Sequence, residues 1–108
     1  MEFTKEELKS AAGAAVAEFE RETARAQSNG KTCHPHTVGK GKLYLNIIFN
    51  REIPRSGTSR IESWVDGYTK DPLSDQETNR AFRYGLHAGL GSLGLEMPER
   101  SGADTRTR

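Results

Sequence analysis

The sequence predicts an α+β fold: an N-terminal helix, a small antiparallel β-sheet of two to three strands, and a C-terminal helix that packs on one face of the sheet. Three observations carry this prediction: a helical hydrophobic period near the amino end, an alternating apolar run in the middle, and a second helical period further on. A chain of 108 residues is short enough for a single domain, which we place at residues 1–97, with a flexible tail at residues 98–108.

The first helix is predicted at Lys5–Gln27. Thr4 and Glu7 form the Thr-x-x-Glu pattern of a capping box at its start. Gly30 follows its end and can take the left-handed conformation that terminates many helices. The apolar residues at helical spacing are Leu8, Ala12, Ala15, Val16 and Phe19.

The middle of the chain predicts the sheet. In KLYLNIIFN the apolar residues alternate with polar ones, as in a half-buried strand, and they are Leu43, Leu45, Ile47 and Phe49. A tight turn at Gly39–Gly41 lets Thr32–Val38 pair back as a short strand. Pro35 lacks a backbone N–H, so we expect that strand at an edge of the sheet.

Residues 60–69 fit two structures. A helix is indicated by a second Thr/Ser-x-x-Glu pattern, Ser59 with Glu62, and by the helical spacing of Ile61, Trp64, Val65 and Tyr68. A strand at residues 43–50 needs a partner for its backbone groups, however, and residues 61–65 supply one. We therefore expect a hairpin, with the helix as the alternative.

The last predicted element is a helix at Asp75–Leu90, opened by Ser74 and Glu77 as a further capping box. Its buried face is Phe82, Leu86, Leu90 and Leu93. Gly85 and Gly89 inside it indicate close packing, either on the alanine-rich first helix or on a second copy of the chain. We expect a homodimer, formed through this face or through an exposed sheet edge.

Charge is distributed in blocks. Residues 31–60 hold six basic residues and one acidic residue, a net charge of +5, whereas residues 1–30 and 61–98 carry −2 and −3. The whole chain has a net charge of only +1, which disfavours a dedicated nucleic-acid binder. No apolar run approaches the roughly 20 residues of a membrane span. The single cysteine excludes an internal disulfide, and we expect a cytoplasmic protein.

The segment CHPH places Cys33, His34 and His36 close together in the sequence. A structural zinc site needs four ligands, and His87 is the only further histidine. No second sequence signature supports Cys33 as a nucleophile. We therefore expect no metal, no cofactor and no enzymatic activity.

The segment NREIPRSGTSR, residues 50–60, is the most basic part of the chain. Our leading hypothesis is a small interaction protein, such as an inhibitor, adaptor or accessory factor of the kind that phages also encode. The predicted partner-binding residues are Arg51, Arg55 and Arg60 from this loop and Arg80, Arg83 and Tyr84 from the last helix. The alternative is a nucleotide or nucleic-acid site, in which the anion-binding residues are Arg55, Ser56, Gly57, Thr58 and Arg60.

Overall fold

The structure is a computed structural model and describes residues 2–97. Across these residues every regular element is a helix and none is a β-strand, so the α+β prediction is wrong. The elements are α1 (Lys5–Ser28), α2 (Pro35–Ile47), the π-helix η1 (Ile48–Glu52), α3 (Ile53–Ser56), α4 (Ile61–Thr69) and α5 (Gln76–Ser92). The tail predicted at residues 98–108 lies outside the described residues.

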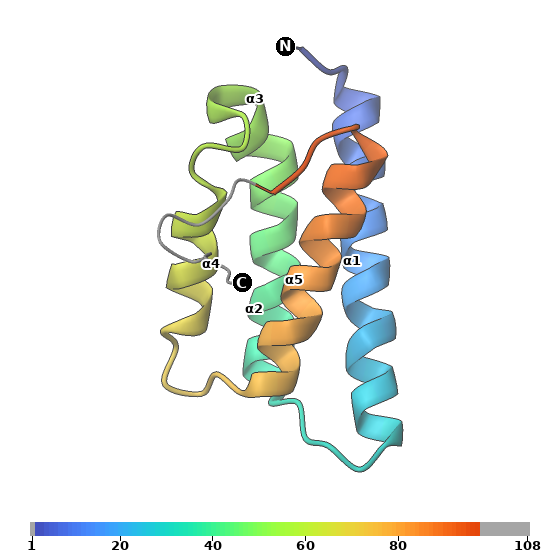
Figure 1. Ribbon diagram of the computed structural model, residues 1–108, viewed down its shortest axis with the longest axis vertical. Coiled ribbons are helices and arrows are strands. Elements are labelled where there is room, and N and C mark those ends of the chain that lie inside the picture. Colours follow the sequence, from blue (N-terminus) through green and yellow to red (C-terminus); the bar gives the residue numbers. More distant parts are fainter. Residues whose placement is uncertain (1, 98–108) are drawn as a thin grey trace, which may run out of the picture.

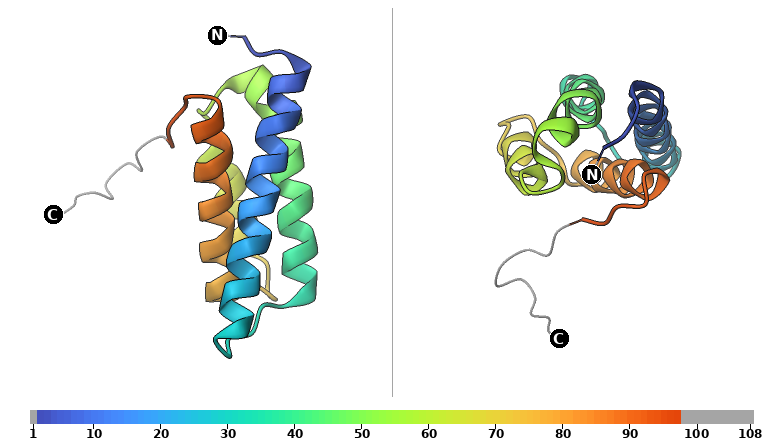
Figure 2. Two further views of the ribbon diagram at one scale, coloured as in Figure 1. Left: turned by 90° about the vertical axis from the view of Figure 1, so that its right-hand side faces the viewer. Right: turned by 90° about the horizontal axis from the view of Figure 1, so that it is seen from above.

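The four longer α-helices form an antiparallel bundle. Helices α1, α2, α4 and α5 run alternately down and up in Figure 1. The end view in Figure 2 places α1 and α4 on opposite sides, with α2 and α5 between them. Helix α1 packs mainly on α5, and the diagonal pair α2 and α5 also touch. Among the described helices, none is both long and apolar enough to cross a membrane.

Helix α1 confirms the prediction for the amino end. The Glu7 N–H donates to Thr4 Oγ1 at 3.0 Å and the Thr4 N–H donates to Glu7 Oε1 at 2.8 Å, so the capping box is complete. Gly30 has a positive φ of 82°, as expected of the residue that ends the helix. Leu8 and Phe19 point into the core together with the predicted alanines, and Val16 is half-buried.

The strand predicted at residues 43–50 is wrong, because that segment belongs to α2 and η1. Leu43, which the alternating pattern places on a buried face, is 58% exposed. The buried positions follow a helical period instead: Thr37, Gly41, Leu45, Ile48 and Phe49. Favourable tertiary packing of this face outweighs the β propensity of the isoleucines and the phenylalanine.

The short edge strand and its turn are wrong as well. Pro35 is the first residue of α2, where the missing N–H costs nothing, and His34 is the N-cap. Gly39 and Gly41 lie inside α2 and make no turn. With no sheet in residues 2–97, the sheet edge offered as a dimer contact is also absent there.

Residues 60–69 form α4, so the hairpin is wrong and its helical alternative is correct. Ile61, Val65 and Tyr68 are buried, as the helical spacing requires. The second capping box does not form, because the N-cap is Arg60 and no side chain caps the helix. The three arginines of NREIPRSGTSR are therefore not at the tip of a hairpin. Arg51 lies in η1, Arg55 lies in α3, and Arg60 directly precedes α4.

Helix α5 confirms the last predicted element, with a different first residue. Asp75 and not Ser74 is the N-cap, and its Oδ1 accepts a hydrogen bond from the Thr78 N–H at 2.7 Å. Phe82 is fully buried on the predicted apolar face. Its ring stacks on Tyr68 at a centroid distance of 4.2 Å and meets the edge of Phe19 at 6.3 Å.

Glycines let the helices approach one another closely. A Cβ atom added to Gly85 would lie 2.8 Å from the Ala15 carbonyl oxygen, and one added to Gly41 would lie 2.5 Å from the Phe19 ring. Gly89 faces the ring of Phe49 in the same way. The predicted packing of α5 on the alanine-rich α1 is thus confirmed. Because these glycines are buried within the chain, their face is not open to a second copy.

The π-helix η1 connects α2 to α3. The Ile53 N–H donates to the Ile48 carbonyl, five residues back instead of four. Pro54 accounts for the position of this wider turn, since its ring would clash with the carbonyl four residues earlier in a regular α-helix. Ile48, Phe49 and Ile53 are buried in this segment, whereas Glu52 stays at the edge of the core.

We predict that Gly85→Ala destabilises the fold by about 1–3 kcal/mol, because the backbone of Ala15 cannot move aside as a side chain would. Gly91→Ala is the matched control on the same helix, since nothing lies within 4 Å of its added Cβ. Its better helix propensity stabilises α5 by up to about 1 kcal/mol. Urea denaturation measures both effects, and equal stabilities for the two variants would contradict this packing.

Candidate functional site

The basic segment lies at the end of the bundle where η1, α3 and the start of α4 follow one another (Figure 1). Arg51, Arg55 and Arg60 are all exposed there. Arg60 Nε lies 3.7 Å from Glu52 Oε2 in a long ion pair. Arg51 and Arg55 form no ion pair with any residue of the range 2–97. They are four residues apart in continuous helical backbone, so they project from the same side.

A groove lined by both apolar and polar residues lies beside Arg55 at the α3 end. Its volume is about 450 Å³, and three separate parts of the chain form it: the segment before α1, α3 with the loop that follows, and the segment after α5. The lining residues are Phe3, Ile53, Pro54, Arg55, Gly57, Thr58 and Leu95. Glu2 lines a smaller neighbouring hollow, so the charge around this end is mixed. Among the described residues that line the groove, Arg55 is the cation.

The loop between α3 and α4 already uses the donors that an anion would need. The Gly57 N–H donates to the Ile53 carbonyl at 2.8 Å, and the Ile61 N–H donates to Thr58 at 3.2 Å. Both the N–H and the hydroxyl of Ser59 donate to the Ser56 carbonyl. The predicted anion-binding residues are therefore adjacent, but the backbone N–H groups of this loop donate to carbonyls of the same segment and not outward.

The residues predicted on the last helix form a second, separate group. Helix α5 starts at the opposite end of the bundle, and residues 80–84 lie in its first half (Figure 1). Arg80 Nη2 lies 3.4 Å from Glu77 Oε1 and Arg83 Nη1 lies 3.5 Å from Glu62 Oε2, so both arginines are paired within the chain. Tyr84 is 43% exposed, with the Arg80 guanidinium over its ring.

The residues of CHPH have three different structural roles. Cys33 is buried, with its Sγ 4.0 Å from the Thr23 carbonyl oxygen. His34 caps α2, its Nδ1 accepting from the His36 N–H at 3.1 Å. His36 Nε2 lies 2.9 Å from Asp71 Oδ2. Within residues 2–97 no group of three or more His, Cys, Asp or Glu side chains is placed to hold a metal ion.

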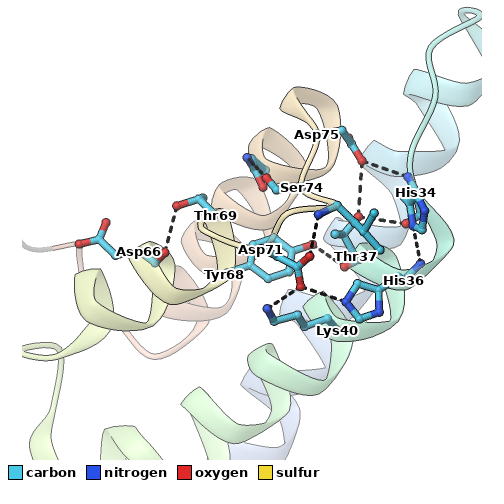
Figure 3. Close-up of polar contacts among 12 residues, drawn as sticks. His34, His36, Thr37, Lys40, Asp66, Tyr68, Thr69, Asp71, Ser74 and Asp75 are labelled. Atoms are coloured by element: carbon cyan, nitrogen blue, oxygen red, sulfur yellow. Dashed lines mark hydrogen bonds and ion pairs between the residues drawn. The ribbon is translucent and has the colours of Figure 1, made fainter.

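A polar cluster at the opposite end of the bundle joins the start of α2 to the connection between α4 and α5 (Figure 3). Asp71 Oδ2 accepts from Lys40 Nζ at 2.8 Å as well as from His36. Asp75 Oδ2 accepts from the His34 N–H at 3.0 Å. The Tyr68 hydroxyl donates to the buried Thr37 carbonyl at 2.5 Å. These groups satisfy one another, so the cluster fixes the ends of the helices.

Ionisation in this cluster follows from its contacts. Chiefly the hydrogen bond from Lys40, with those from the Leu73 N–H and His36, holds the pKa of Asp71 far below its ordinary value. Burial alone would raise the pKa of Asp75, but hydrogen bonds from the His34 backbone and from Thr78 outweigh it and lower that pKa. Burial raises the pKa of Tyr68 well above that of a free tyrosine, and the charge of Asp75 adds to this effect.

The sequence prediction missed both the cluster and the walls of the groove. Asp71 lies in a segment interpreted only as a break between elements, and its partner Lys40 comes from the segment predicted as a turn. Phe3 directly precedes the N-cap Thr4, which is the position of a hydrophobic staple, so this signal was present in the sequence. Leu95 offered no comparable signal.

Comparison with known proteins adds no assignment to this geometry. No protein-family model, curated protein or solved structure matches the chain. The functional argument therefore rests on the residues of the two bundle ends.

We predict that the Asp71→Asn variant loses less stability than the unmodified protein when the pH is lowered from 7 to 2. The quantity compared is the free energy of unfolding as a function of pH, whose low-pH part we call the acid limb. The folded-state pKa values of Asp71 and Asp75 lie below those of the unfolded chain, so their ionised forms stabilise the fold at neutral pH. This contribution is lost as the pH falls below the ordinary aspartate pKa of about 3.9. Urea midpoints between pH 7 and pH 2 measure it.

The control for this experiment is Glu20→Gln, which removes an exposed carboxylate from its ion pair with Lys42. Exposed pairs contribute little to stability, so this variant keeps the acid limb of the unmodified protein. An acid limb for Asp71→Asn that matches the unmodified protein would contradict the assigned role of the cluster.

Proposed function

We propose that this protein is a non-enzymatic interaction protein whose α3 end binds a partner protein, as an inhibitor, adaptor or accessory factor does, in the cytoplasm. The observation that carries the proposal is the pair Arg51 and Arg55, both exposed and without an ion pair among the described residues, with Arg55 at the wall of a groove that Phe3, Pro54 and Leu95 also line. We define Arg51, Arg55 and this groove as the α3-end surface.

The α3-end surface has the features of a protein-binding site. An unpaired arginine offers its full set of donors to a partner carboxylate, in a planar geometry that permits two parallel hydrogen bonds. Within residues 2–97 no ion pair of Arg51 or Arg55 has to break first. The groove formed by Phe3, Pro54 and Leu95 can hold one or two apolar side chains, which supply the buried centre of an interface. The partner segment we expect therefore combines apolar and acidic residues.

The predicted contacts from α5 have a weaker basis. Arg80 and Arg83 already pair with Glu77 and Glu62, so a partner has to compete with these carboxylates. The Arg80–Glu77 pair is exposed and worth at most about 1 kcal/mol, so a partner can compete for Arg80. We therefore place the main contact at the α3 end and treat Tyr84 and its neighbours as a secondary surface.

The nucleotide or nucleic-acid alternative stays a prediction with less support. Four donors of the loop, the N–H groups of Gly57, Ser59 and Ile61 and the Ser59 hydroxyl, are occupied by loop carbonyls. A phosphate at this loop would then be bound only by the guanidinium groups of Arg55 and Arg60. The Arg60 group already lies 3.7 Å from the Glu52 carboxylate. The homodimer also stays a prediction, without the two contact surfaces first expected for it.

The test uses an array of ten-residue peptides in which Leu, Ile or Phe is combined with Asp and Glu. Each peptide has a twin in which Asn and Gln replace the acids. We expect the protein to bind some acidic members in preference to their twins, with affinity that falls as salt is raised, since exposed charges are screened. The double substitution Arg51→Ala with Arg55→Ala should weaken this binding by at least tenfold.

The matched control is Lys31→Ala with Lys70→Ala, which removes the same charge from exposed positions near the opposite end. This variant keeps the binding of the unmodified protein if position decides it. Equal losses in the two double variants would indicate a non-specific effect of charge. The proposal fails if no acidic peptide binds better than its neutral twin, or if the arginine variant binds them all as before.

A further inference from the structure

A second cavity lies between the α2–η1 segment and α4. Its volume is about 260 Å³, and its walls are Tyr44, Glu52, Arg60, Ser63, Trp64 and Gly67. This is below the usual range of pockets for drug-sized ligands, which begins at about 300 Å³. The cavity is therefore suited to a group of the size of one side chain.

The carboxylate of Glu52 is the acidic group of this cavity. Its side chain is only 13% exposed, and within residues 2–97 its ion-pair partner is Arg60, whose Nε lies 3.7 Å from Oε2. That distance is too long for a hydrogen bond. The Arg60 side chain is 66% exposed, so it can leave this position at little cost. Glu52 is thus a largely buried carboxylate whose ion-pair partner within residues 2–97, Arg60, is distant and easily displaced.

Glu52 lies within the π-turn η1. The Ile53 N–H donates to the Ile48 carbonyl five residues back, and Ile48, Phe49 and Ile53 of this segment are buried. Glu52 is left at the margin of the core, where the cavity opens. Wider turns of this type occur frequently at functional sites.

Aromatic rings complete the walls. Tyr44 and Trp64 meet edge to face at a centroid distance of 5.3 Å and an interplanar angle of 89°. Lys40 Nζ already lies 5.3 Å from the centre of the Tyr44 ring, so one face of this tyrosine holds an ammonium group within the chain itself. Aromatic faces attract cations through their quadrupole, most strongly in tryptophan.

We propose that this cavity binds an ammonium group carried on an alkyl stem, the chemistry of a lysine side chain or a free alkylamine. The carboxylate of Glu52 is the counter-ion, Trp64 and Tyr44 contact the stem and its charge, and Arg60 moves aside as the ligand enters. The site does not depend on the proposed role of Arg51 and Arg55, so either proposal can fail without the other.

Trp64 is the only tryptophan of the chain, so its fluorescence reports on the cavity alone. The probes are Nα-acetyl-lysine methylamide, n-butylammonium, and Nε-acetylated lysine methylamide as the neutral compound. We expect a saturable change with the two cations, with a roughly millimolar dissociation constant for so small a contact, and none with the neutral compound. Tighter binding of the lysine compound assigns a protein side chain as the occupant, and equal or tighter binding of n-butylammonium assigns a free amine.

Two substitutions with opposite effects test the mechanism. Glu52→Gln keeps the shape of the side chain and removes its charge, so it should weaken binding by about tenfold or more. Arg60→Ala removes the competing cation and should strengthen binding severalfold. Glu18→Gln is the matched control, because Glu18 pairs with Arg21 on α1 and does not line the cavity. It should bind as the unmodified protein does.

Circular dichroism and urea midpoints establish that each variant is folded. If Glu52→Gln does not fold, the strengthened binding of Arg60→Ala carries the test by itself. The proposal is overturned if the unmodified protein shows no saturable response to either cation. It is equally overturned if Glu52→Gln, when folded, binds the cations as tightly as the control, or if the neutral compound binds as well as they do.

Discussion

The rest of the structure depends on the contact between glycines and bulky groups on neighbouring helices. Gly41 receives the ring of Phe19, Gly89 receives the ring of Phe49, and Gly85 lies against the Ala15 carbonyl. Only 33% of the residues are hydrophobic, so the chain cannot fill a wide core with large side chains. Helices that approach closely need fewer of them. The contact of Gly89 with Phe49 joins α5 to η1, and η1 also packs on α1, so the bundle fixes where η1 and α3 carry Arg51 and Arg55.

The sequence predicts the two outer helices well because their signals are local. Thr4 and Glu7 mark the start of α1, and the apolar period of α5 is unbroken from Phe82 to Leu90. The centre of the chain fails for a physical reason. The buried face of α2 includes Gly41, which has no apolar side chain. The sequence therefore shows no clear helical period there, and the alternating apolar residues from Leu43 onward predict a strand instead.

The candidate sites were predictable only in part. Arginines are usually exposed, so the exposure of Arg51 and Arg55 was predictable. Their surroundings were not, because these depend on whether residues 60–69 form a strand or a helix. The groove joins Phe3 to Leu95, two residues that only the tertiary fold brings together. Glu52 lies in a π-turn just before Pro54, and no hydrophobic pattern reveals such a turn. The two proposed sites thus use one irregular segment, η1 with α3, in different ways.

The most direct test of this account is an NMR measurement of residues 41–53 and 85–89 in the unmodified protein. We predict helical Cα and Cβ chemical shifts throughout residues 43–52, with nuclear Overhauser contacts from the Hα atoms of Gly41 to the Phe19 ring and from those of Gly89 to the Phe49 ring. The result that would contradict it is a set of strand-like shifts at residues 43–49 with cross-strand contacts to residues 61–65, as in the hairpin that the sequence alone favours.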